Sequence, residues 1–171
     1  SFGDEPDTVI KFSIAAINGY QSNGGYMACA KHFPGEGFCQ KDPHHSLEVI
    51  DIPLYEMYRL HLAPFKAAIE ASVSSVMVNH AIYSSLDPDN PVTFSDKILK
   101  GVLRNEFGFN GLIITDALEM GGIAKNYPPE EVAVRALRAG CDILLCPVDE
   151  NYPDYIMSAI RNGDLDENTI N

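Results

Sequence analysis

The stretch that decides the fold, residues 26–45, reads YMACAKHFPGEGFCQKDPHH. Its apolar start, residues 26–30, is typical of a buried strand and stops at Lys31 and His32. The polar loop that follows the Pro/Gly turn carries Asp42, His44 and His45. A strand that ends in titratable groups at the start of a long loop indicates the active-site edge of an α/β enzyme.

Three other segments are almost continuously apolar: residues 75–78 (SVMV), 111–114 (GLII) and 141–146 (CDILLC). Strands without polar alternation are typical of a parallel sheet that is covered on both faces. Helical patterns separate the strands, at residues 7–20, 53–71, 95–107, 129–140 and 152–161. This order predicts parallel strands joined by helical crossovers. No glycine-rich phosphate loop follows any strand, which argues against a Rossmann or P-loop domain.

Three residues set the expected helix boundaries. Pro64 falls inside residues 53–71 and predicts either a kink or the first turn of a second helix. Ser95 is expected to cap the helix that follows it, and Gly108 to end that helix.

Polar residues end three of the four strands: Lys31-His32, Asn79-His80 and Thr115-Asp116. The carboxyl ends of parallel strands share one edge, where both barrels and open sheets keep their chemistry. A complete eightfold barrel takes about 250 residues. We therefore predict a (β/α)8 TIM-type barrel of which residues 1–171 hold only the later strands and helices, as one partial catalytic domain.

Composition narrows the class of ligand. The chain has 24 acidic and 12 basic residues and a net charge of −12, which argues against nucleic acid as a partner. A neutral small molecule suits this charge better. No stretch approaches the roughly 18 apolar residues of a membrane span. The four cysteines form no CxxC pair; Cys29 and Cys141 are expected in the core, and a disulfide between Cys141 and Cys146 is not expected.

Asp116 is the first candidate for catalysis. A carboxylate at the mouth of a strand is costly to desolvate unless it is paired or used, so it is a candidate nucleophile or base. The alternative is a helix cap. Glu119 is a competitor that we expect to face helix or solvent.

Asp42 and His44 form the second candidate. In an extended loop, residues two apart project to the same side, so the carboxylate can orient the imidazole as a general acid/base. His45 is an alternative for that role, and a solvated surface loop is the structural interpretation.

Substrate binding is assigned to three residues at the strand ends, Lys31, His32 and His80. The alternative is that these side chains only make structural hydrogen bonds. His61 is expected to be structural. A metal site made by His32, His44, His45 and Asp42 lacks a recognised ligand spacing, so neither metal nor cofactor is predicted.

Five segments together resemble family 3 glycoside hydrolases, most closely their β-N-acetylglucosaminidase branch. They are KHFPG at 31–35, DPH at 42–44, VNHAIYSSLDPDNPVTFS at 78–95, LRNEFGFNGLIITDALEM at 103–120 and AGCDILLCP at 139–147. The resemblance implies a retaining hydrolase that releases terminal β-linked N-acetylglucosamine. It implies that Asp116 is the nucleophile, that His44 with Asp42 is the acid/base, and that Lys31 and His32 contact the sugar.

The chain departs from that family's pattern in several places. Glu36 stands where the family loop usually has His, and Pro43 replaces a small residue. The family's early strands are absent, so we expect a missing N-terminal half-barrel or a partner chain to complete the site. A glycoside phosphorylase, a β-glucosidase and a non-catalytic sugar-binding fragment are the alternative functions. The sequence leaves open whether the natural substrate is a cell-wall muropeptide, a chitin oligomer or another glycan.

Overall fold

The computed structural model describes residues 2–38 and 47–170. Its central sheet has three parallel strands in the order β1 (Cys29–Phe33), β3 (Ser75–Val78) and β5 (Leu112–Thr115). β3 lies between its two neighbours and pairs with β5 in unbroken register, Ser75 opposite Leu112 and Val78 opposite Thr115. A second parallel pair joins β2 (Val49–Ile50) to β4 (Ile82–Tyr83).

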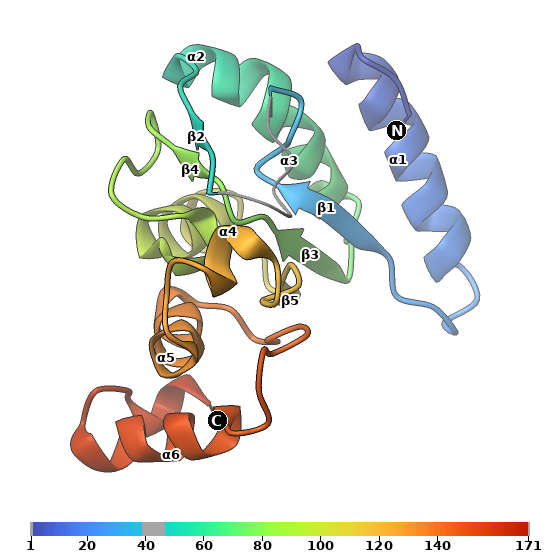
Figure 1. Ribbon diagram of the computed structural model, residues 1–171. Coiled ribbons are helices and arrows are strands. Elements are labelled where there is room, and N and C mark those ends of the chain that lie inside the picture. The colour runs from blue at the N-terminus through green and yellow to red at the C-terminus, as the bar shows by residue number, and fades with distance from the viewer. Residues whose placement is uncertain (1, 39–46, 171) are drawn as a thin grey trace.

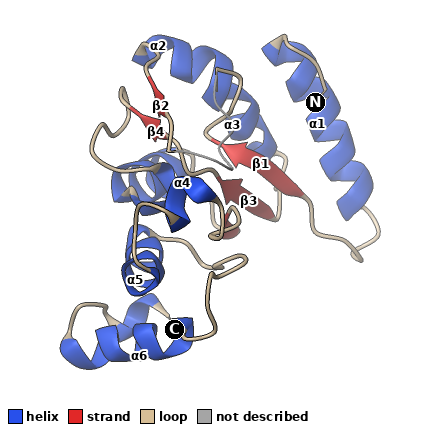
Figure 2. Cartoon of the chain, in the orientation of Figure 1, coloured by secondary structure: helices blue, strands red, loops and turns tan. Residues whose placement is uncertain are grey.

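Helices surround the sheet, as Figure 2 shows. α1 (Pro6–Gln21) packs on α3 (Ala63–Glu70), and α5 (Pro129–Ala139) packs on α6 (Tyr152–Asn162). Figure 1 places α1 and α6 at opposite ends of the molecule. The remaining helical segments are α2 (Leu54–Glu56), η1 (Met57–Leu62), η2 (Val92–Phe94), η3 (Lys97–Glu106), α4 (Gly121–Ala124) and η4 (Glu167–Thr169).

The predicted helices are confirmed, and their boundaries have local causes. Pro64 stands in the first turn of α3, which continues directly from the π-helical segment η1. Ser95 caps η3 because its Oγ accepts a hydrogen bond from the Ile98 N–H at 3.2 Å. Gly108 follows η3 with a φ of +68°, a left-handed conformation that glycine adopts without steric cost.

The expected first strand was misplaced. β1 begins at Cys29 and contains Lys31 and His32, whereas Tyr26 and Met27 before it are 74% and 64% exposed. Cys29 is exposed, contrary to the expectation that it lies in the core. Among the described residues β1 is paired on one side only, with β3, so its residues are less covered than those of the central strand.

The fourth predicted strand, at residues 141–146, was predicted too long. It forms a single parallel bridge, between Ile114 and Ile143. Two residues after Ile143, the Leu145 N–H donates to the side-chain hydroxyl of Thr115 at 2.9 Å and not to a strand carbonyl, so the ladder ends there. Cys141 is buried, as predicted, and Ile143 remains 39% exposed.

The core lies around β3, where Val76 and Val78 are fully buried, together with Ile113 of β5 and Leu99 and Leu103 of η3. The parallel, helix-covered arrangement is confirmed for this open sheet; the strands of the described residues do not close into a barrel. Within residues 2–38 and 47–170, no helix is both long and apolar enough to cross a membrane.

Candidate active site

Asp116 directly follows β5 and stays attached to the sheet. Its backbone N–H donates to the carbonyl oxygen of Val78 at 2.9 Å, and its carboxylate Oδ1 accepts from the Ala117 N–H at 2.8 Å. The side chain is 17% exposed. The next helix, α4, begins only at Gly121, so Asp116 does not cap it. A fixed, partly buried carboxylate at the carboxyl end of a strand is therefore available for chemistry.

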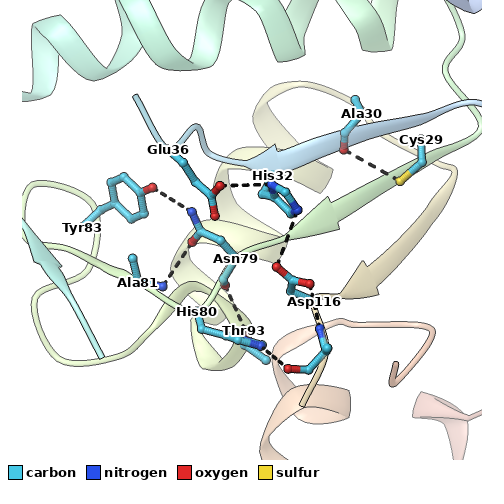
Figure 3. A network of polar contacts seen from close by, with 11 residues as sticks. Cys29, Ala30, His32, Glu36, Asn79, His80, Ala81, Tyr83, Thr93 and Asp116 are labelled. Atoms are coloured by element: carbon cyan, nitrogen blue, oxygen red, sulfur yellow. Dashed lines mark hydrogen bonds and ion pairs between the residues drawn. The ribbon is translucent and has the colours of Figure 1, made fainter. Parts of the chain in front are cut away.

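His32 in β1 lies close to Asp116 after β5, although β3 separates these two strands in the sheet (Figure 3). Its Nε2 lies 3.6 Å from Oδ2 of Asp116, and its Nδ1 lies 3.1 Å from Oε2 of Glu36. Lys31 is exposed beside it and lines a groove of about 960 Å³ together with His32 and Glu36. The structure thus brings His32 and Asp116 together at the sheet edge, with Lys31 adjacent to His32 in β1.

His80 is buried and engaged on both sides of its ring. Nε2 lies 3.0 Å from the carbonyl oxygen of Ala117, and Nδ1 lies 2.7 Å from the hydroxyl of Thr93. Burial lowers the pKa of His80, although the Ala117 hydrogen bond and the charge of Asp116 act to raise it. The Thr93 hydroxyl in turn donates to the carbonyl oxygen of Asn79 at 3.0 Å, so this contact links His80 to the end of β3. His80 therefore holds the backbone that follows Asp116, and its contact with substrate remains a prediction.

His61 supports the turn between β1 and Glu36. The residue is 7% exposed, and its Nδ1 lies 3.2 Å from the carbonyl oxygen of Gly35. Burial lowers the pKa of His61, against the raising effect of the Gly35 hydrogen bond. These contacts agree with the structural role that was predicted for it.

A buried network that the sequence did not suggest fixes the same turn. The Asn79 amide donates to the hydroxyl of Tyr83 at 2.8 Å, and that hydroxyl donates to the Gly35 carbonyl at 2.7 Å. The side chains of Asn79 and Tyr83 are almost fully buried. The sequence pointed to Asn79, because this residue follows a predicted strand. Nothing in the sequence pointed to Tyr83, whose role comes from its contact with Gly35, 48 residues away.

Asp42, His44 and His45 lie outside the described residues, so their predicted roles stay predictions. Glu119 is exposed, as expected. Among residues 2–38 and 47–170, no group of three or more His, Cys, Asp or Glu side chains is arranged to hold a metal ion.

Residues 1–171 match the family described as the glycosyl hydrolase family 3 N-terminal domain. The chain belongs to this family. A β-hexosaminidase of Nitrosomonas eutropha is 36% identical over 162 residues, which cover 94% of this chain and 46% of that protein. A family 3 β-N-acetylglucosaminidase of Paenibacillus sp. str. FPU-7 superposes with a TM-score of 0.94 at 35% identity, over 99% of this chain and 33% of the other.

A structure described as a β-glucoside phosphorylase is also similar, with a TM-score of 0.92 at 25% identity over 99% of this chain and 32% of the other. This family 3 chain thus spans about half the length of the curated relatives that it matches. The family assignment confirms the resemblance seen in the sequence.

Proposed function

We propose that the intact protein is a retaining glycoside hydrolase that releases terminal β-linked N-acetylglucosamine. The observation that carries this proposal is the Asp116 carboxylate, held at the carboxyl end of β5 with its Oδ2 3.6 Å from Nε2 of His32. Membership of family 3 and the similarity to proteins named β-hexosaminidase support the substrate class.

The proposed mechanism has two steps. In the first, Asp116 attacks the anomeric carbon and forms a glycosyl ester while His44, oriented by Asp42, protonates the departing glycosidic oxygen. In the second, His44 takes a proton from water, whose oxygen attacks the anomeric carbon and releases Asp116 as a carboxylate. A histidine that is neutral after the first step also does not repel an anionic nucleophile such as phosphate, as a carboxylate would.

Lys31 and His32 are proposed to bind hydroxyls of the sugar. Lys31 is exposed and His32 partly buried on one wall of the groove between β1 and α1, so both are accessible to a ligand that enters it. A lysine ammonium can donate to sugar hydroxyl oxygens, and a ring nitrogen of histidine can accept a hydrogen bond from a sugar hydroxyl or donate one to it.

The rest of the (β/α)8 barrel is proposed to come from an N-terminal half-barrel or a partner chain. β1 is paired on one side only within the described residues, and Tyr26 and Met27, which precede it, are exposed. The free edge of β1 leaves backbone N–H and C=O groups that a further parallel strand could pair.

The test is hydrolysis of an aryl β-N-acetylglucosaminide by the intact protein, compared with the corresponding aryl β-glucoside. We expect faster release from the N-acetylglucosaminide, and proton NMR of the first-formed sugar should show the β-anomer. A first-formed α-anomer would contradict the retaining mechanism. Binding of N-acetylglucosamine without any turnover would favour a sugar-binding protein instead.

The similarity to a β-glucoside phosphorylase supports one second candidate on the same site, transfer of the glycosyl group to phosphate. Product analysis with and without inorganic phosphate separates the two reactions. Hydrolysis predicts free N-acetylglucosamine in both cases, whereas a phosphorylase yields the sugar 1-phosphate when phosphate is present.

A further inference from the structure

The ring of His32 lies between two carboxylates, and the two contacts differ in length (Figure 3). Nδ1 lies 3.1 Å from Glu36, within hydrogen-bonding distance, whereas Nε2 lies 3.6 Å from Asp116. A contact of 3.6 Å is too long for a hydrogen bond, so Glu36 is the stronger anchor of the ring.

The backbone before Glu36 is fixed to the core. The Gly35 carbonyl accepts hydrogen bonds from the hydroxyl of Tyr83 at 2.7 Å and from Nδ1 of His61, 3.2 Å away. Both donors are buried. The backbone that carries Glu36 is therefore held in place, and the Glu36 side chain contacts His32, four residues earlier in the sequence.

An imidazole that donates from Nδ1 to a fixed acceptor cannot turn about its Cβ–Cγ bond without breaking that hydrogen bond. Nε2 lies on the far side of the ring and is directed at Asp116 by the same constraint. We infer that Glu36 is a positioning residue: its carboxylate holds the His32 ring so that Nε2 stays directed at the Asp116 carboxylate. This inference rests on the proposed function of Asp116 as nucleophile.

A positioning role predicts a specific kinetic signature. Misplacing the group beside a nucleophile raises the barrier of the chemical step more than it weakens binding of the substrate. In the intact protein, Glu36→Ala should lower kcat by roughly 10-fold or more, a larger change than any rise in KM for the aryl β-N-acetylglucosaminide that comes from the proposed contact of His32 with the sugar.

Two further substitutions separate the reach of the side chain from its charge. Glu36→Gln keeps the length and an acceptor oxygen, so it should retain kcat within about 3-fold of the parent. Glu36→Asp keeps the charge but is one methylene shorter, so it should lose kcat as Glu36→Ala does. Glu119→Gln, a change at an exposed carboxylate three residues after Asp116 in the sequence, is the matched control and should leave kcat unchanged.

The tautomer of His32, that is, which ring nitrogen carries the hydrogen, can be measured independently of the kinetics. Long-range proton–nitrogen NMR of labelled histidine should show an Nδ1–H on His32 in the parent and in Glu36→Gln, and a smaller Nδ1–H fraction in Glu36→Ala. Equal melting temperatures exclude unfolding as the cause.

Two results would overturn the inference: a Glu36→Gln variant as impaired as Glu36→Ala, or a rise in KM with kcat unchanged. Either can occur while Asp116→Asn still abolishes turnover, so failure of this inference is distinguishable from failure of the proposed function.

Discussion

The hydroxyl of Tyr83 donates a hydrogen bond to the carbonyl oxygen of Gly35, 2.7 Å away, across 48 residues of sequence. This contact joins the turn after β1 to β4 and fixes the backbone between His32 and Glu36. The geometry of the candidate site therefore depends on a residue that does not touch it.

The Gly35 turn has little room for a side chain. Gly35 has a φ of +122°, and a Cβ there would lie 2.9 Å from Nδ1 of the buried His61. Gly35→Ala should therefore destabilise the intact protein by about 1–3 kcal/mol in a denaturant titration.

The matched control for that change is Gly37→Ala, two residues further along the same turn. A Cβ at Gly37 would meet His61 Cε1 at an ordinary 3.5 Å. We expect a change within about 0.5 kcal/mol for this variant. Equal losses at the two glycines would contradict the proposed crowding at Gly35.

Asp87 fixes the loop between β4 and η3. It is fully buried and accepts hydrogen bonds from Ser95 Oγ at 2.7 Å and from Lys97 Nζ at 3.2 Å. Burial acts to raise the pKa of Asp87, but the hydrogen bonds from Ser95, Asn90, Asp89 and Lys97 outweigh it and lower the pKa. The ionised carboxylate therefore stabilises the fold, and protonating it removes that contribution.

Asp87→Asn should reduce the free energy of unfolding by about 2 kcal/mol at pH 7, because it loses charge-assisted hydrogen bonds. A carboxyl whose pKa is lowered by folding stabilises above its unfolded pKa, about 3.9, and loses this effect as the pH falls further. The difference between variant and parent should therefore shrink below about pH 4. Asp89→Asn, at a side chain that is 76% exposed, is the control and should cost less than about 0.5 kcal/mol.

The lowered pKa values of His61 and His80 predict a second effect of pH on stability, near neutrality. Burial lowers the pKa of both rings in the folded protein. The unfolded chain then binds more protons than the folded chain just below the ordinary histidine pKa, so stability should fall as the pH drops through about 6.5. NMR titration of the two rings, assigned with a His61→Gln variant, measures this directly. A ring of His80 that titrates at or above the ordinary value would refute it.

Much of the fold could be predicted because local patterns decide it. The apolar run of β3 and the cap at Ser95 gave the right elements, since each depends on neighbours in sequence. The predicted limits of β1 and of the strand at residues 141–146 were wrong, because an apolar segment was assumed to pair with a neighbouring strand along its whole length. Strand limits also depend on neighbouring strands, and Leu145 N–H pairs with a side chain instead.

The candidate site was likewise predictable only in part. Asp116 and His32 were predictable, because polar residues after apolar strands meet at one edge of a parallel sheet. The support from Tyr83 was not predictable, since no sequence pattern marks a contact made through a folded turn. Glu36 stood in the most informative stretch but was seen only as a departure from the family's usual residue.

The role of Asp116 is the central claim, and mass spectrometry of a trapped intermediate tests it most directly. The intact protein should be incubated with a fluorinated N-acetylglucosaminyl donor that slows the second step, digested, and analysed by peptide mass. The account predicts one added sugar on the peptide that contains Asp116, and no adduct in Asp116→Asn, whose turnover should be abolished. Unchanged hydrolysis by Asp116→Asn, or an adduct on another residue, would contradict the account.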